Sequence, residues 1–320
     1  MRIKKSLTAA LLAALFASPA YPWGAQGHAA VGLVAEQRLN AGARRHIEQI
    51  LGNCDLASIA SWMDDLRAAT AGFGRLASNP EARQFGARFP HNGNWHFDDL
   101  PMGETGYRDD DPFSRPDDVV HELNLAVRVL EGKSAVVPPK IAIYMVVHFV
   151  GDVHQPLHVA CGYYNLSNPA RPVLVTDPKA AVGLEDDKGA NDLSYGSGRW
   201  EELHAYWDDV LPRKVAGSQE VPALAKVLEG AIRPEAWASS GDHHTWAEAW
   251  ATESLVAARQ AYAGVVFGAA EVENGRLRRI PITLPADYDA YAIPLARERL
   301  AKAAFHLAEL LDAIDWPAQG

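Results

Sequence analysis

One short stretch of the chain, HFVGDVHQPLH, holds four side chains that bind metals in other proteins. His148 and Asp152 stand four residues apart, so on a helix their side chains share a face and can close on one ion. Imidazole nitrogens and carboxylate oxygens together suit zinc. His154 and His158 follow, but Pro156 should kink or end the helix, so helical spacing does not fix the direction of His158. The segment predicts a metal site, and His158 could bind a second ion.

A second pair with the same spacing lies in ELHAYWD, where His204 and Asp208 are four apart on an expected amphipathic helix. A lone histidine is more often a hydrogen-bonded core or surface residue than a ligand. A single pair of this kind is more often an exposed ion pair or a helix cap. Two such pairs, with further histidines in one acidic chain, favour metal binding instead.

Three further segments say little when each is taken alone, because aromatic residues pack and acidic residues usually mark solvated loops. They are WGAQGH with Trp23 and His28, SWMDDLR with Asp64, Asp65 and Arg67, and NWHFDD with His96, Asp98 and Asp99. The first segment gains interest if Trp23 begins the mature chain, since a deprotonated terminal amine is a metal ligand.

The N-terminus has the pattern of a secretory signal peptide, with basic residues ahead of an apolar run over 7–16 and then small residues. The apolar run is about half of the roughly 20 residues that a membrane-spanning helix needs, so no anchor is expected in the mature protein. We expect a signal peptide over 1–22, cleaved after Ala20 or Pro22. The domain would then cover 23–320, in the periplasm or secreted.

The formal net charge is −10, and removing the three basic residues of the signal segment takes it to −13. Such a chain lacks the overall positive charge of a duplex-binding protein, so any attraction to nucleic acid must be local. Bound divalent cations are a natural source of local positive charge. Cys54 and Cys161 permit one disulfide, but their pairing does not follow from sequence.

Apolar residues spaced three and four apart dominate the chain and predict helices. These are expected over 29–39, 119–130, 141–153, 199–210, 245–263 and 293–311. Stretches rich in Gly, Pro and Asp over 71–93, 101–116 and 162–197 predict long loops. We therefore expect one all-α domain with irregular loops over one face.

In this order, the five metal-binding and acidic segments resemble the S1/P1 nuclease family, which shares its helical fold with bacterial zinc-dependent phospholipase C. The resemblance covers nearly the whole mature chain. It extends to WATES, which ends at Ser254, and to the closing stretch YAIPLARERLAKAAFHLAELL.

The resemblance implies three zinc ions with nine ligands. One ion takes Asp64, His96, His148 and Asp152; a second shares Asp152 and adds His28 with the amine and carbonyl of Trp23; a third takes His158, His204 and Asp208. The family pattern Trp-x-Asp selects Asp64 over Asp65. Arg67 falls where the family keeps an arginine for the transition state. Phe97 and Asp99 fall where nuclease members stack and hydrogen-bond a base.

The implied enzyme is an endonuclease that cleaves single-stranded DNA and RNA to 5′-phosphate products, with 3′-nucleotidase activity alongside. A hydroxide shared by zinc ions would attack phosphorus in line, since the cations lower the pKa of bound water. A cleft built on rigid helices admits a flexible single strand more easily than a stacked duplex. Nucleotides are expected as ligands, and the protein is expected to be a monomer.

A zinc-dependent phospholipase C on the same fold is the main alternative. Its terminal Trp lies farther from the next histidine than Trp23 does from His28, and its last ion is completed by Glu rather than by Asp208. A zinc-storage or adhesion protein would explain the histidines but not Arg67. Two departures from the family are a longer loop over 162–187 and Gly189-Ala190-Asn191 in place of Gly-Gly-Asn. His154 is not a family ligand, and we expect it to hydrogen-bond to a ligand.

Overall fold

A buried helix, α7 (Pro139–His154), runs through the middle of the protein. Every residue from Ile141 to His154 is buried, because the sequence is apolar around most of the helix. The computed structural model describes residues 23–198 and 201–318. The predicted signal segment 1–22 lies outside these residues.

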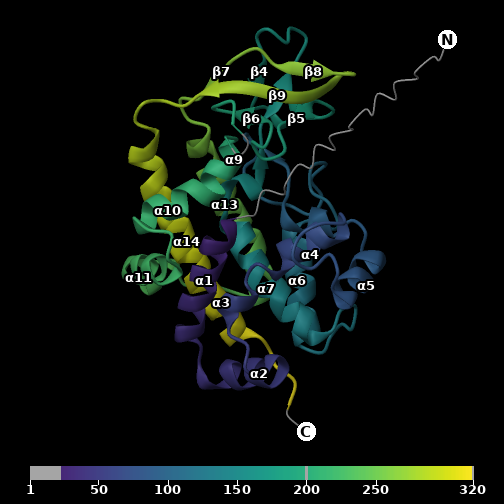
Figure 1. Ribbon diagram of the computed structural model, residues 1–320, viewed down its shortest axis with the longest axis vertical. Coiled ribbons are helices and arrows are strands. Elements are labelled where there is room, and N and C mark those ends of the chain that lie inside the picture. The colour runs from purple at the N-terminus through teal and green to yellow at the C-terminus, as the bar shows by residue number, and fades with distance from the viewer. Residues whose placement is uncertain (1–22, 199–200, 319–320) are drawn as a thin grey trace, which may run out of the picture.

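Most of the predicted helices are confirmed. The segment over 119–130 forms α6, and the others form α1, α7, α13 and α14 with bounds that shift by a few residues. The bounds are α1 (Gly24–Arg38), α6 (Val119–Leu130), α13 (Trp246–Ala261) and α14 (Tyr288–Ala313). Pro156 has the expected effect: α7 ends at His154, and a 3-10 turn, η2 (Pro156–His158), follows. Helices α1, α6, α13 and α14 pack around α7 (Figure 1).

The prediction of one regular helix over 199–210 is wrong in detail. A short helix leads into a π-helical turn, η3, and then into α10, while Arg199 and Trp200 lie outside the described residues. The bounds are α9 (Leu203–Ala205), η3 (Tyr206–Val210) and α10 (Leu211–Ala216). Pro212 has no N–H for the carbonyl of Asp208 four residues earlier, and its ring would clash with that carbonyl in an α-helix. The wider π turn avoids that clash.

Several shorter helices were not predicted. They are α2 (Ala41–Leu51), α3 (Leu56–Ile59), α4 (Trp62–Thr70), α5 (Pro80–Arg88), η1 (Asn92–His96), α8 (Pro178–Ala181), α11 (Val221–Ala231), α12 (Pro234–Trp237) and η4 (His243–Thr245). Helix α5 corrects the loop expected over 71–93. Its start has a recognisable signal, since Asn79 caps the amide of Ala82 and Pro80 occupies the first turn.

The described residues also form short strands, and β4 to β9 lie at one end of the helical body, toward the top of Figure 1. They are β1 (Leu100–Pro101), β2 (Ala160–Cys161), β3 (Tyr163–Asn165), β4 (Val173–Val175), β5 (Glu185–Asp186), β6 (Leu193–Ser194), β7 (Val266–Phe267), β8 (Glu271–Glu273) and β9 (Arg276–Thr283). Strand β3 lies between β4 and β5, and β9 pairs with β6, β7 and β8. The loop expected over 162–197 is therefore partly ordered into β3 to β6 and α8. The fold is nevertheless mostly helical and forms a single domain, as the sequence predicted.

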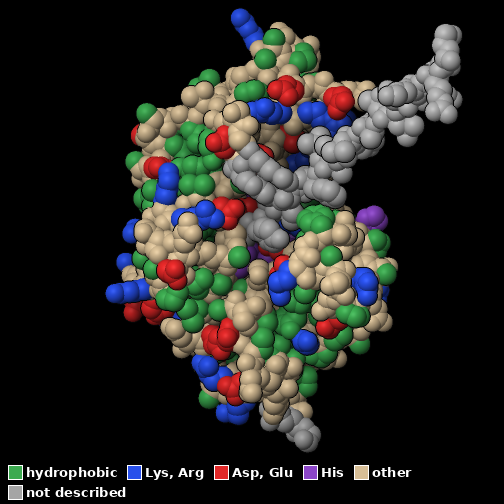
Figure 2. All heavy atoms as spheres, viewed as in Figure 1, with side chains coloured by type: hydrophobic (Ala, Val, Ile, Leu, Met, Phe, Trp, Pro, Cys, Tyr) green, Lys and Arg blue, Asp and Glu red, His purple; other side chains and the backbone are tan. Residues whose placement is uncertain are grey.

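The two cysteines are not bonded to each other: Cys54 is exposed and Cys161 is buried, and both thiols are free. Among the described residues, no helix is long and apolar enough to cross a membrane. On the face drawn in Figure 2, acidic and basic side chains are interspersed, without a broad patch of one sign.

A close approach between α1 and α3 provides a test of the packing. A Cβ atom on Gly32 would lie 2.8 Å from the carbonyl oxygen of Leu56, which is backbone and cannot swing aside. We expect Gly32→Ala to lower the free energy of unfolding by about 1–3 kcal/mol. Gly230→Ala is the matched control in α11, where a Cβ meets nothing within 4 Å. The control should raise stability by up to about 1 kcal/mol in urea denaturation, through helix propensity. Equal effects of the two variants would contradict the packing described.

Candidate metal centre

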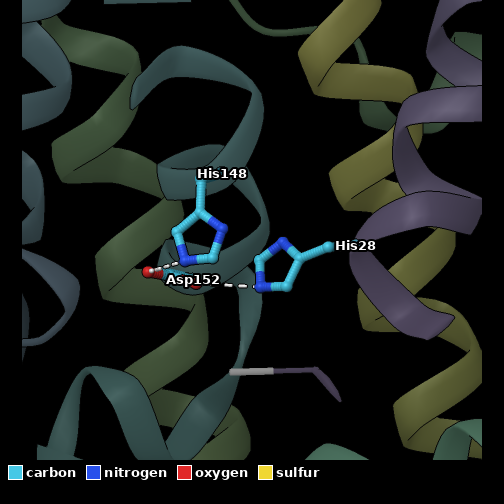
Figure 3. Close-up of side chains that lie close together, drawn as sticks. All are labelled: His28, His148 and Asp152. Carbon is cyan, nitrogen blue, oxygen red and sulfur yellow. Dashed lines mark ion pairs between the residues drawn. The ribbon is translucent and has the colours of Figure 1, made fainter. Parts of the chain in front are cut away.

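Three buried side chains from two helices meet at the C-terminal half of α7 (Figure 3). His148 and Asp152 share one face of α7, and His28 reaches them from α1. The Oδ1 and Oδ2 atoms of Asp152 lie 3.2 Å from His28 Nε2 and 3.3 Å from His148 Nε2. Gly151 permits this approach, since a Cβ there would lie 2.6 Å from the His28 ring. One carboxylate thus faces two imidazoles, as a shared ligand would.

Asp64 from α4 and His96 from η1 approach the same place. Together with His148 and Asp152 they form a first ligand group. His96 Nδ1 lies 3.1 Å from both Asp152 Oδ2 and His148 Nε2. The Asp64 oxygens lie 3.7 Å from His96 Nδ1 and 3.7 Å from His148 Nε2. The structure therefore brings together the four residues of the first predicted set, none of which is exposed.

A separate group unites the other predicted pair with the histidine after Pro156. His204 Nε2 lies 3.1 Å from His158 Nε2 and 3.0 Å from Asp208 Oδ2. The backbone nitrogen of Trp23 lies 3.1 Å from Asp208 Oδ1, and the Trp23 carbonyl accepts a hydrogen bond from the amide of Gly27. Trp23 therefore lies beside Asp208, where its nitrogen donates a hydrogen bond.

The donor atoms have the spacing of ligands around a common ion. Atoms bonded to a tetrahedral zinc at about 2.0–2.2 Å lie about 3.3–3.6 Å apart. The separations within the two groups run from 3.0 to 3.7 Å, within a few tenths of that range. Both oxygens of Asp64 accept no hydrogen bond from the described residues, although Arg67 Nη2 lies 3.2 Å from Asp64 Oδ1.

Hydrogen bonds to backbone carbonyls fix which imidazole nitrogens are bare. The Nδ1 atoms of His148, His158 and His204 lie 2.6, 2.7 and 2.6 Å from the carbonyl oxygens of Ala60, His96 and Gly189. A carbonyl only accepts, so each Nδ1 carries a proton, and in a neutral ring Nε2 is left with a lone pair. These lone pairs point into the two groups of ligands.

Burial keeps two of these rings neutral, because it lowers the pKa of His148 and of His158 well below the usual range. Burial opposes charge on His204 too, but Asp208 raises the pKa of that ring. Burial also raises the pKa of Asp64 and of Asp152 well above the usual range. Facing lone pairs and packed carboxylates repel one another unless protons or cations lie between them. The residues present therefore fit a metal cluster.

The turn before His204 depends on one glycine. Gly189, whose carbonyl holds His204, has a φ of +61°, and a Cβ there would lie 2.1 Å from the carbonyl oxygen of Leu157. No other residue type fits. Ala190 replaces the second glycine of the family pattern and keeps a φ of +68°, at a cost of about 1–2 kcal/mol.

The predicted substrate residues lie in a segment held between ligands. The amide of Asp98 donates to the carbonyl of His158 (2.8 Å), and β1 continues the pairing with β2. Phe97 follows His96 in extended conformation, and Asp99 comes two residues later. Arg115 contacts both, with its guanidinium over the Phe97 ring and 2.5 Å from Asp99. Nothing in the sequence singled out Arg115, which comes from an expected loop.

His154 does not have the role that we expected. Its Nδ1 hydrogen-bonds to the carbonyl of Val150 (2.7 Å), and its Nε2 lies 2.7 Å from His306 Nδ1 on α14. Two residues beyond Asp152 on a helix, a side chain points to nearly the opposite face. His154 therefore packs between helices and contacts no predicted ligand.

A third His and Glu group lies at the end of α6, where His243 and His244 face Glu131. His243 Nε2 lies 2.8 Å from Glu131 Oε1, which is an ordinary hydrogen-bond distance. Lys133 Nζ lies 3.1 Å from Glu131 Oε2 and supplies positive charge. Protein groups thus balance the carboxylate without an ion, unlike those of the central cluster.

This fold and site define a mostly helical protein with a candidate metal centre buried between its helices. Comparison with known proteins gives the family: the S1/P1 nuclease model matches residues 23–315. The chain is 27% identical to nuclease PA3 of a Penicillium species and to nuclease P1 of Penicillium citrinum, each over 91% of this chain and 97% of the relative. It is 24% identical to nuclease S1 of Aspergillus oryzae, over 96% of both chains. The chain belongs to the S1/P1 nuclease family and is a hydrolase of phosphodiester bonds.

Removing the metal should destabilise the protein, because chelation leaves buried carboxylates and lone pairs facing one another. We expect a chelator to lower the free energy of unfolding by about 3–5 kcal/mol, measured by urea denaturation and restored by adding the metal back. The control is the double variant His243→Ala, His244→Ala, which should lose as much stability on chelation as the unaltered protein. A chelator effect that disappears in this variant would place the metal at the end of α6 instead.

Proposed function

We propose that the protein is a zinc-dependent endonuclease that cleaves single-stranded DNA and RNA to products with 5′-phosphates, and that it also acts as a 3′-nucleotidase. The observation that carries this proposal is the pair of buried ligand groups, with Arg67 beside the first. The nuclease relatives support the same chemistry. Phosphodiester hydrolysis needs an activated water and charge stabilisation at phosphate oxygens, and both can come from a metal cluster.

Three zinc ions are proposed, held by the sets that the family resemblance implies. They are Asp64, His96, His148 and Asp152; Trp23, His28 and the shared Asp152; and His158, His204 and Asp208. Imidazole and carboxylate donors at tetrahedral spacing favour zinc over calcium or magnesium, which prefer oxygen ligands alone. When bound, zinc lowers the pKa of water and offsets the charge of phosphate.

The protein's own residues are proposed to orient the metal ligands and to stabilise the charge on the phosphate. Backbone carbonyls hold the rings of His148, His158 and His204, so each Nε2 stays aimed inward. Arg67 lies one helical turn after Asp64, and its side chain is 21% exposed. Its guanidinium is proposed to donate hydrogen bonds to phosphate oxygens as charge develops there. Removing one such donor typically costs about 10²–10³ in rate.

The preference for single strands is proposed to come from the segment after His96. A base can stack on Phe97 and hydrogen-bond to Asp99 only when it is turned out of a helix, which a single strand allows without unpairing. On the face drawn in Figure 2, basic side chains are interspersed with acidic ones and form no extended positive track for a duplex. Attraction must then come from the cluster and Arg67.

A phospholipase C remains the second candidate, and the site disfavours it. Asp208 occupies the place where that branch uses Glu, and Trp23 keeps the nuclease spacing to His28. The relatives reported above are nucleases. We further propose that residues 1–22 are a signal peptide, that 23–320 is the nuclease domain, and that the mature protein is a periplasmic or secreted monomer.

The function is tested by digesting single-stranded DNA, single-stranded RNA, duplex DNA and phosphatidylcholine in parallel. We expect rapid cleavage of both single strands to 5′-phosphate ends, little cleavage of the duplex, and no lipid hydrolysis. Chelation should abolish the activity, and zinc should restore it. Lipid hydrolysis without nucleotide release would refute the proposal in favour of the phospholipase.

The mature N-terminus provides a second test, because the Trp23 nitrogen can ligate as an amine only if Trp23 is the first residue. Its indole is buried and donates to the carbonyl of Gly151 (2.9 Å), which places the backbone nitrogen beside Asp208. We expect mass spectrometry of the secreted protein to show a chain that begins at Trp23. Recombinant chains that begin at Trp23 and at Tyr21 should differ by one bound zinc. A stable secreted chain that begins at Tyr21 would rule out the nine-ligand cluster.

A further inference from the structure

The guanidinium of Arg115 lies where the proposed function places a base. Its central carbon is 4.7 Å from the centre of the Phe97 ring. Its Nη1 is 2.5 Å from Asp99 Oδ2. A guanidinium is planar and stacks on aromatic rings, and it donates hydrogen bonds to carboxylates. Arg115 therefore makes both of the contacts, stacking and hydrogen bonding, that a base would make at Phe97 and Asp99.

The other oxygen of Asp99 is also engaged. Asp99 Oδ1 accepts a hydrogen bond from the Cys161 thiol at 3.0 Å. Burial raises the pKa of this thiol well above its usual range, so the sulfur keeps the proton that it donates. The amide of Gly189 donates to the same sulfur at 3.0 Å and ties it to the turn that holds His204. Each oxygen of Asp99 thus already accepts one hydrogen bond while Arg115 is in place, and the Arg115 guanidinium lies on the side of Oδ2 where a base would donate.

Arg115 has few close contacts besides those with the Phe97 ring and the Asp99 carboxylate. Its side chain is 30% exposed, and the nearest other carboxylate oxygen, on Asp117, lies 3.9 Å from its Nε. Its Nη2 lies 3.5 Å from the carbonyl oxygen of Phe97, at the limit of a hydrogen bond. The strong contacts are therefore the two that a base would replace. The Arg115 side chain is 30% exposed and that of Asp99 is 16% exposed, so water can replace part of the attraction between them when Arg115 is displaced.

We propose that Arg115 is a specificity residue that occupies the base subsite and must be displaced when a base enters. The inference rests on the proposed function and deepens it. A base that enters gains stacking on Phe97 but loses the stacking and the ion pair of Arg115. The base then adds little to binding, and a strand is held chiefly through its phosphates and the metal cluster. The enzyme should consequently distinguish poorly among bases.

The opposite effect is expected if Arg115 itself recognises the base. In that case the guanidinium would stay in place and offer its N–H groups to acceptor atoms on the base edge, as arginine does toward guanine. Removing Arg115 would then weaken the contribution of the base rather than strengthen it. The two hypotheses therefore predict opposite changes in the contribution of the base to kcat/KM when Arg115 is removed.

The test compares strands that carry bases with a strand that has none. Initial rates are measured on short single strands of each of the four bases and on an abasic strand with the same sugar-phosphate backbone. The quantity compared is the ratio of kcat/KM with a base to kcat/KM without one. The variants are Arg115→Ala and Arg115→Gln, and the second keeps a polar partner for Asp99 if the first folds poorly. Arg108→Ala, an exposed arginine of the same loop that pairs with Asp111, is the matched control.

We expect the ratio to rise about tenfold in both Arg115 variants, mostly through a lower KM, because base stacking on the freed Phe97 ring is worth that much. Differences among the four bases should grow at the same time, and the control should keep the unaltered ratio. A ratio that falls or stays unchanged in the Arg115 variants would overturn the inference while leaving the nuclease proposal intact. Failure of the unaltered protein to cleave any strand would overturn the nuclease proposal itself.

Discussion

The structure depends on a repulsion among buried ligand groups, which only bound protons or cations relieve. His158 and His204 direct ring nitrogens at each other across 3.1 Å, and Asp64 and Asp152 bring buried carboxylates to the same place. Cations between these groups turn the repulsion into attraction. Because the ligands come from α1, α4, η1, α7, η2, α9 and η3, the same cations would join segments that are far apart in the chain. Folding and metal binding are therefore expected to be coupled.

Three irregular stretches of backbone position these ligands. Pro156 ends α7 and so turns His158 away from the group around Asp152, toward His204. The π turn that accommodates Pro212 carries Asp208, and the left-handed turn at Gly189 brings a carbonyl to His204. Each irregularity costs local stability and places one ligand or its hydrogen-bond partner. These three irregular stretches of backbone thus lie beside the candidate metal centre.

Charge explains how an acidic protein could act on a polyanion. The excess of carboxylates is partly a set of ligands, whose charge the bound cations would more than offset. What remains for recognition is local: Arg67 at the cluster and the contacts among Phe97, Asp99 and Arg115. In the proposed reading, the phosphates provide most of the binding energy, and Arg115 limits what any base can add.

The sequence by itself determined the features that follow from local spacing. The pairs His148 with Asp152 and His204 with Asp208 were found because four residues make about one helical turn, and α6 and α7 were found because apolar residues recur with the helical period. Asp64, His96 and His28 were named only through a family resemblance, since nothing local shows that α4, η1 and α1 converge on α7. Only tertiary structure decided that Arg115 covers Phe97, that His154 turns toward His306, and that short strands fill the expected loop. These outcomes depend on contacts between residues far apart in the chain, about which the spacing of neighbouring residues carries no information.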